Sequence, residues 1–261
     1  MNFLGLVLTL LVGLFILLGS MFGSKFKDNK RFTDFSISLA FGVIIALIIF
    51  EILPETYEVL SSQLNLFRTI ICIIILVLIG IYILKILDSF IPHHEHEAHH
   101  SHKHKNDDCH NEHLKHIGLM SAMAVIIHNI IEGMSLYLVS TTSIISGLFM
   151  CIGIGLHNIP MGLMISTTLY NSNYTKKDIV KISLIVSLST FVGGLVMFIL
   201  GGVPHLTEGI LLGITLGMLI YISIFELFHQ IYHMDYKKIC NIGIAFGFML
   251  LIIGMLIKYL I

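Results

Sequence analysis

The sequence predicts an all-α membrane protein that crosses the bilayer eight times. Hydrophobic residues make up 56% of the chain, charged residues make up only 12%, and the mean hydropathy is +0.93. Soluble domains carry about 25% charged residues, so this composition excludes a water-soluble globule. The apolar residues also gather in eight runs, and a run of about 20 residues is long enough to cross the hydrocarbon core as a helix.

The eight apolar runs define the predicted helices. In chain order they cover 3–22, 34–53, 67–87, 117–139, 144–169, 179–202, 207–232 and 239–260. The first run has no basic residues before it and is longer than a signal peptide's apolar core, so we expect a helix of the mature protein. The whole chain, 1–261, is predicted to form one transmembrane domain with a polar loop at 88–116. The net charge of −1 argues against nucleic acid as a partner.

Lysine and arginine predict the orientation. Threading the chain through the eight spans places 13 of the 15 lysines and arginines on one side of the membrane. Only Arg68 and Lys258 fall on the other side. Because positive residues in short loops stay cytoplasmic, we expect both termini outside the cell and the loop 88–116 inside it. The predicted location is the cell membrane, with multiple passes.

Two internal resemblances indicate inverted repeats. The segment 42–53 resembles 217–228, and each carries a glycine followed nine residues later by a glutamate. The motif HNIIEG at 128–133 resembles HNIPMG at 157–162. Within each pair the two helices cross the membrane in opposite directions, which is typical of alternating-access transporters that hold the substrate where the repeats meet. Chance similarity between apolar helices is the alternative, and the matched glycine–glutamate spacing argues against it.

A group of polar residues falls near the middle of two predicted spans. A charged residue at the bilayer centre costs about 2.5–3.5 kcal/mol and therefore needs a partner or a cavity. Residues four apart on a helix share a face, and neutral imidazole and carboxylate are ligands for first-row divalent metals. The alternative is a hydrogen-bonded polar cluster that joins the two helices. We expect a metal site formed by His128, Glu132, His157, Asn129, Asn158 and Met161.

The loop between the third and fourth spans is rich in histidine. Such a tract cannot build a packed core, so we expect 93–116 to be disordered and to capture metal ions loosely. A purely solvating linker is the alternative. The candidate loop ligands are His93, His94, His96, His99, His100, His102, His104, His110, His113 and His116.

Two smaller groups lie toward opposite ends of the predicted spans. Glu226, His229 and His233 are spaced to share one helical face near the cytoplasmic end, where they would form an ion exit. Ordinary interfacial polarity explains them equally well. Glu51 and Glu55 lie toward the outer end of the second span, where we expect an entrance for cations, although surface solvation also accounts for Glu55.

These features together resemble the ZIP (ZRT/IRT-like protein) metal transporters, in particular their bacterial zinc-uptake and GufA-like branches. The resemblance is most specific at 128–133 and 157–162, and it covers essentially the whole chain. It implies a 3+2+3 helix arrangement, zinc or a related divalent cation as substrate, and transport toward the cytoplasm.

The resemblance also implies roles for particular residues. His128 and Glu132 match metal ligands of the family's fourth helix, His157 matches a ligand of the fifth, and Asn129 matches a position that serves a second metal in some members. This chain has Met161 where many relatives have a second glutamate. Thr190 occupies a position where some relatives place a further glutamate. We therefore expect one metal at the transport site, and the soft thioether of Met161 favours zinc, cadmium or iron over manganese.

We predict a secondary transporter of a divalent cation, with zinc as the first candidate and no catalytic cofactor. The chain has no GxxxxGK[ST] motif for ATP hydrolysis. Two alternatives are kept: efflux in place of uptake, and an intramembrane metal-dependent enzyme. The enzyme lacks an HExxH motif and a spare general base, so we do not favour it. The sequence leaves the oligomeric state open, with a homodimer as the candidate assembly.

Overall fold

The computed structural model describes residues 3–26, 29–90, 105–172, 174–201 and 204–259. Within these residues the ordered elements are all helices and no strand occurs. The elements are α1 (Phe3–Lys25), α2 (Lys30–Leu47), η1 (Ile48–Ile52), α3 (Leu53–Ser61), α4 (Leu66–Phe90), α5 (Lys105–Thr142), α6 (Ile144–Asn171), α7 (Lys176–Leu200), α8 (His205–Tyr221), η2 (Ile222–Phe228), α9 (His229–His233) and α10 (Lys237–Tyr259).

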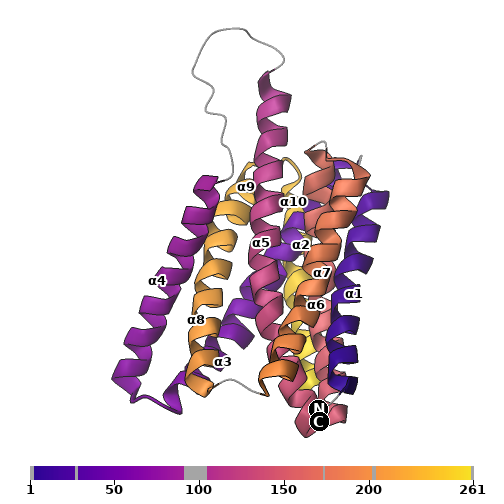
Figure 1. Cartoon of the computed structure of the whole chain (residues 1–261). Coiled ribbons are helices and arrows are strands. Elements are labelled where there is room, and N and C mark those ends of the chain that lie inside the picture. Colours follow the sequence, from indigo (N-terminus) through magenta and orange to yellow (C-terminus); the bar gives the residue numbers. More distant parts are fainter. Residues whose placement is uncertain (1–2, 27–28, 91–104, 173, 202–203, 260–261) are drawn as a thin grey trace.

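Eight helices in the described residues are long and apolar enough to cross a membrane, which confirms the predicted fold class. The second of them is built from α2, η1 and α3, and the seventh from α8, η2 and α9. Both of these helices therefore contain a short π-helical segment. Figure 1 shows the two chain ends together at one end of the bundle and α5 projecting from the opposite end.

The projecting part of α5 corrects one expectation. The tract 93–116 was predicted to be disordered, but α5 begins at Lys105, so the backbone of 105–116 is helical. Once a helix has nucleated, each added residue loses conformational freedom but gains one backbone hydrogen bond. A membrane helix can therefore extend into a polar tract at a low cost in free energy. His110, His113 and His116 lie on this extension. The other seven loop histidines lie outside the described residues.

Polar caps explain where several helices begin. The side chains of Asn29, Ser143 and Thr175 each accept a hydrogen bond from the backbone N–H three residues later. Each cap satisfies a donor that the first turn would otherwise leave unpaired. The helix α7 ends at Leu200 and is capped by Gly201, whose φ of 71° lies in the left-handed region that glycine adopts without strain.

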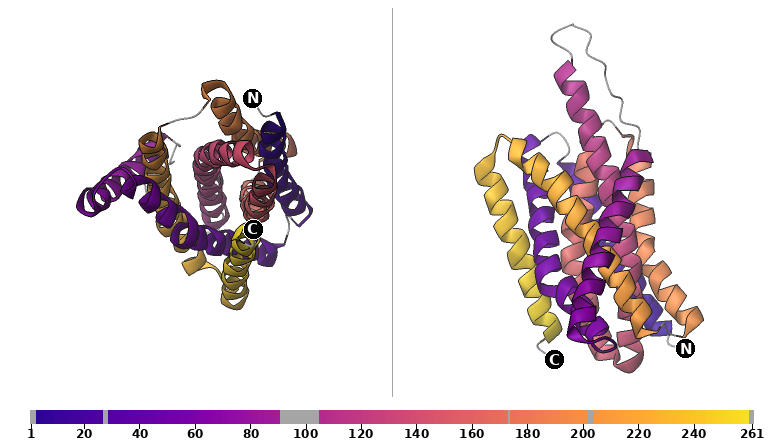
Figure 2. Two further views of the ribbon diagram at one scale, coloured as in Figure 1. Left: turned by 90° about the horizontal axis from the view of Figure 1, so that it is seen from below. Right: turned by 90° about the vertical axis from the view of Figure 1, so that its left-hand side faces the viewer.

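The helices α5 and α6 lie at the centre of the bundle (Figure 2, left). In the most apolar stretch of α6, 72% of the residues are buried. The corresponding share in α4 is 17%, so α4 presents most of its surface outward. The helix α1 packs on α6 and α7, and α5 packs on α6 and α7. The helices α2 and α10 pack together, as do α4 and α8.

The two segments that resemble each other in sequence also pack alike. Gly42 of α2 lies against the backbone of Ile244 in α10, and Gly217 of α8 lies against the backbone of Val77 in α4. A side chain at either glycine would collide with the facing carbonyl. The glutamate nine residues after each glycine, Glu51 or Glu226, lies within a π-helical segment. The sequence match therefore coincides with a match in helix contacts and in backbone geometry.

Candidate metal centre

The central helices α5 and α6 bring the two HN motifs to one depth. Only Ser143 separates the end of α5 at Thr142 from the start of α6 at Ile144, so the helices run antiparallel. His128 lies 14 residues before the end of α5 (142 − 128), and His157 lies 13 residues after the start of α6 (157 − 144). Because each residue advances a helix by about 1.5 Å, the two imidazoles reach the same level.

Three side chains meet at that level and form a buried His128–Glu132–His157 triad. The Oε1 atom of Glu132 lies 2.9 Å from Nε2 of His157 and 3.2 Å from Nε2 of His128. One ligand atom from each residue falls within 4.8 Å of the others. The exposed fractions are 1% for His128, 8% for Glu132 and 2% for His157. Two helices thus bring two imidazole nitrogens and one carboxylate together in the interior of the bundle.

This donor set suits a divalent cation such as zinc. Zinc binds histidine nitrogen at about 2.0–2.1 Å and carboxylate oxygen at about 2.0–2.2 Å, commonly in tetrahedral geometry. Donor atoms within 4.8 Å of one another can reach a single ion after small side-chain rotations. The second oxygen of Glu132, Oε2, is buried and has no hydrogen-bond partner among the described residues. The same three groups also form the hydrogen-bonded cluster considered as the alternative, since His157 and Glu132 are within hydrogen-bond distance.

Amide and hydroxyl groups next to the triad are also buried. Asn129 donates a hydrogen bond from Nδ2 to the carbonyl of Val186 in α7 at 3.1 Å, while its Oδ1 atom has no partner among the described residues. Both polar atoms of Asn158 and the hydroxyl of Thr190 are likewise buried and unpartnered there. Buried polar atoms without partners are rare in folded proteins and call for an explanation by water, an ion or strain.

The helix α7 approaches α5 beside the triad. Gly133, next to Glu132, lies so close to the backbone of Thr190 that a Cβ atom would collide with its carbonyl oxygen. Gly162 of α6 makes the equivalent approach to the backbone of Ile16 in α1. The glycines that follow the two histidines therefore set the distances from the central helices to their outer neighbours.

Met161 is also buried, one turn after His157. Its side chain is fully enclosed and belongs to the main apolar cluster of the protein, together with Ile16 and Met164. The thioether therefore contributes to packing in this cluster.

A narrow cavity borders the triad on one side. It has room for about one water-sized sphere (about 10 Å³) and takes its polar lining from Glu51 and His157. Glu51 is half-buried and lies on the π-helical segment η1. The remaining lining comes from α6 and α10: Met150, Gly153, Ile154, Leu251, Gly254 and Met255.

The contribution of α10 to this cavity was not predicted from the sequence. The lining residues of α10 are apolar or glycine, so nothing in them indicates a polar site. The only signal is the pair of small residues Gly153 and Gly254, which face each other where α6 and α10 meet.

The residues predicted to form an exit do not share one environment. Glu226 is buried, with 6% of its surface exposed, whereas His229 and His233 are exposed. The two imidazole rings lie edge to face, with their centroids 4.9 Å apart. A π-helix has more residues per turn than the α-helix assumed for the spacing, so the η2 segment rotates Glu226 relative to the histidines that follow.

The fold and the site define a class of protein: a multi-pass helical membrane protein with a buried His/Glu cluster suited to a divalent cation. The chain belongs to the ZIP family, because the family described as ZIP zinc transporter matches residues 1–255. The members of this family are transporters and not enzymes, and divalent metal transport, with zinc as the metal, is the activity that the family supports for this chain.

Curated relatives agree with this family over most of the chain. The zinc transporter ZupT of Chlorobaculum parvum is 27% identical over 226 residues, covering 84% of each chain. The ZupT protein of Streptococcus mutans is 24% identical over 258 residues, covering 98% of this chain and 97% of the relative. That of Oceanobacillus iheyensis is 26% identical over 262 residues, covering 97% of both.

Proposed function

We propose that the protein carries a divalent cation, zinc before iron, cadmium or manganese, across the cell membrane into the cytoplasm. The observation that carries this proposal is the triad, in which ligand atoms of His128, Glu132 and His157 lie within 4.8 Å of one another inside the bundle. The ion binds between α5 and α6, which the proposal takes as the middle pair of a 3+2+3 arrangement with both termini outside.

The site holds one metal ion at a time. Glu132 is the only carboxylate of the triad, and a single carboxylate balances half the charge of one dication. The positions of Met161 and Thr190 supply no further negative charge. Asn129, Asn158 and Met161 complete the surroundings of the ion with carbonyl oxygen and soft sulfur.

The ion enters past Glu51 and Glu55 and leaves past Glu226, His229 and His233. The cavity shared by Glu51 and His157 supports the outer half of this path. On the inner half, the segment η2 packs against α5, so Glu226 belongs to an element that contacts the helix of His128 and Glu132. The histidine-rich tract captures the released ion in the cytoplasm.

Metal accumulation in cells tests the proposal. Cells that express the protein should accumulate more zinc than cells that carry an empty vector, and Glu132→Ala should abolish the difference at equal protein level. Glu58→Ala is the matched control, because Glu58 is exposed on α3. Equal zinc accumulation by Glu132→Ala and the unaltered protein would refute the assigned site.

Efflux remains the second candidate, because alternating access is reversible and the ion gradient sets the direction of net flux. Growth on zinc separates the two directions. Uptake predicts that expression makes cells hypersensitive to external zinc, whereas zinc resistance would establish efflux.

A further inference from the structure

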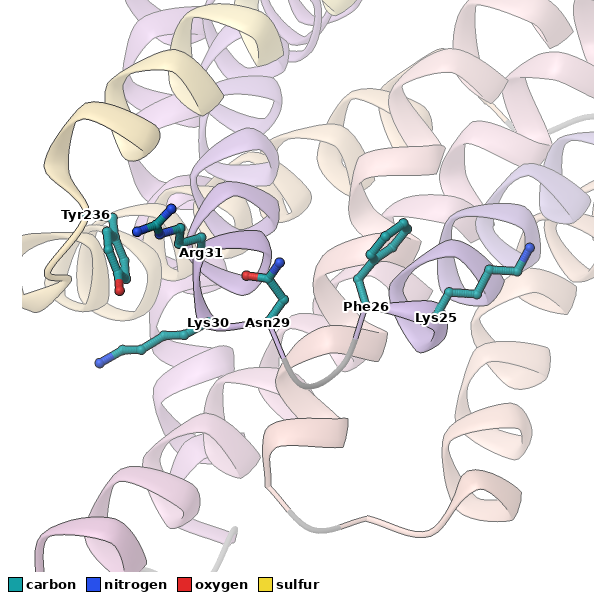
Figure 3. A pocket seen from close by; sticks show the side chains of 6 residues that line it. All are labelled: Lys25, Phe26, Asn29, Lys30, Arg31 and Tyr236. Carbon is teal, nitrogen blue, oxygen red and sulfur yellow. The ribbon is translucent and has the colours of Figure 1, made fainter.

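A basic pocket lies at the turn between α1 and α2, and it shares no residue with the triad. It measures about 550 Å³ and is lined by Lys25, Phe26, Asn29, Lys30, Arg31 and Tyr236. Figure 3 shows Arg31 beside Tyr236 at one edge, Lys25 at the other, and Asn29 and Phe26 between them. We call this site the basic pocket. The transport path proposed above does not use it.

The pocket carries more positive charge than its own contacts neutralise. Lys30 forms an exposed ion pair with Asp235 at 2.7 Å. The guanidinium of Arg31 lies over the ring of Tyr236, 5.0 Å from its centroid. Neither Lys25 nor Arg31 has a carboxylate within ion-pair distance in the described part of the chain. Two cations therefore remain available to an anion.

The pocket also lies at the boundary of the membrane. Lys25 is the last residue of one membrane-spanning helix, and Lys30 is the first residue of the next. Phe22 and Phe26 are about half exposed beside it, and Phe26 stacks on Phe32 with ring centroids 4.6 Å apart. Aromatic side chains gather where a helix leaves the hydrocarbon, and basic pockets between transmembrane helices hold acidic lipid headgroups.

We propose that the basic pocket binds the headgroup of an anionic phospholipid. Arg31, held against Tyr236, takes the phosphate through its planar fork, and Lys25 closes the opposite edge. Because the cations rim a wide pocket instead of meeting at one point, the site fits an extended headgroup better than inorganic phosphate. The exposed apolar face of α1, which includes Leu18, Met21 and Phe22, is available to the acyl chains.

The lipid would join two distant parts of the chain. Arg31 and Lys30 contact Tyr236 and Asp235, which lie in the short segment between α9 and α10. A headgroup in the pocket therefore bridges the end of α1 and the turn that follows His233. The inference does not rest on the metal site, so it can fail while the proposed transport function stands.

Lipid titration of the purified full-length protein in neutral detergent tests the inference, with native mass spectrometry counting the lipids retained. Phosphatidylglycerol should bind at least about tenfold more tightly than phosphatidylcholine, and Lys25→Gln/Arg31→Gln should remove that preference. Arg31→Lys keeps the charge but loses the fork, so it should fall between the two. The matched control is Lys176→Gln/Lys177→Gln, which removes two exposed charges at the start of α7.

Three results would overturn the proposal. The first is an undiminished phosphatidylglycerol preference in Lys25→Gln/Arg31→Gln. The second is an equal loss in Lys176→Gln/Lys177→Gln, which would show a diffuse basic surface. The third is inorganic phosphate displacing the lipid at equal concentration, which would make the site one for free anions. If the double variant does not fold, Lys25→Gln alone and Arg31→Lys decide the question by the same titration.

Discussion

At the scale of single residues, Glu132 is held by contacts from two different helices. Its Oε1 atom contacts both imidazoles of the triad, while its Oε2 atom has no partner among the described residues. Burying a carboxylate away from water is costly unless hydrogen bonds or a cation compensate it. A bound dication would satisfy both oxygens and the two histidines together.

Replacing Glu132 should therefore remove most of the metal affinity. Glu132→Gln keeps the shape of the side chain but removes its charge, and we expect the zinc affinity of the purified protein to fall by at least about 100-fold. Isothermal titration calorimetry measures this directly. The exposed Glu58→Gln serves as control and should bind zinc as tightly as the unaltered protein. An unchanged affinity in Glu132→Gln would show that the carboxylate is not a ligand.

Replacing Met161 should change the metal selectivity of the site more than the stability of the protein. Leucine has a similar volume, so Met161→Leu keeps the apolar cluster packed at a cost of less than about 1.5 kcal/mol. Because a thioether is a soft ligand, cadmium affinity should fall by a larger factor than zinc affinity. Competition titrations with a chromophoric chelator compare the two. Equal losses for both metals, or none, would assign Met161 to packing alone.

At the scale of helices and their contacts, the close approach of α5 and α7 depends on glycines, one of which, Gly133, lies beside the triad. The facing atom at Gly133 is the backbone carbonyl of Thr190, which cannot rotate away from an added methyl group. Gly209 of α8 faces the side chains of Leu60 and Val59, which can shift more readily than a backbone carbonyl. The two positions therefore form a matched pair for testing helix packing.

Gly133→Ala should lower the thermal unfolding temperature of the detergent-solubilised protein, whereas Gly209→Ala should change it little. Overpacking of this kind costs about 1–3 kcal/mol. The added methyl group should also displace the neighbouring Glu132, so the zinc affinity should fall with the stability. If Gly133→Ala were as stable as Gly209→Ala, the close approach of α5 and α7 would not be required for the fold.

The helical elements also show where sequence reasoning succeeds and where it stops. The two HN motifs and the short Ser143 turn were enough to predict that His128, Glu132 and His157 approach one another, because helix periodicity and span length fix their face and depth. The π-helical segments at Glu51 and Glu226 could not be predicted, because one extra residue in a turn depends on packing across the bundle. The exit prediction assumed α-helical spacing, so it did not anticipate that Glu226 is buried while His229 and His233 are exposed.

The early start of α5 has a different cause. Composition predicted disorder for 93–116 because the tract cannot bury apolar surface. That argument leaves out the membrane helix that follows, which nucleates the helix and lets it extend to Lys105. Likewise, Gly254 and its neighbours on α10 carry no polar signal, so their place beside His157 emerges only when the helices are assembled.

At the scale of the whole molecule, the proposed inverted repeats would connect the fold with transport. Gly42 and Gly217 pack on equivalent neighbours, and so do Gly133 and Gly162, while α5 and α6 occupy the centre. Inverted repeats around a central site are the architecture that allows a binding site to open alternately to the two sides of a membrane. The triad lies between the two central helices, where such a change would switch its exposure.

The central claim is that the transported cation binds the His128–Glu132–His157 triad on its way across the membrane. Zinc-65 flux into proteoliposomes that contain either the unaltered protein or Glu132→Gln tests it most directly. The account predicts zinc-dependent, saturable uptake by the unaltered protein, and flux no greater than that of protein-free liposomes for Glu132→Gln. Equal uptake by the two proteins would contradict it.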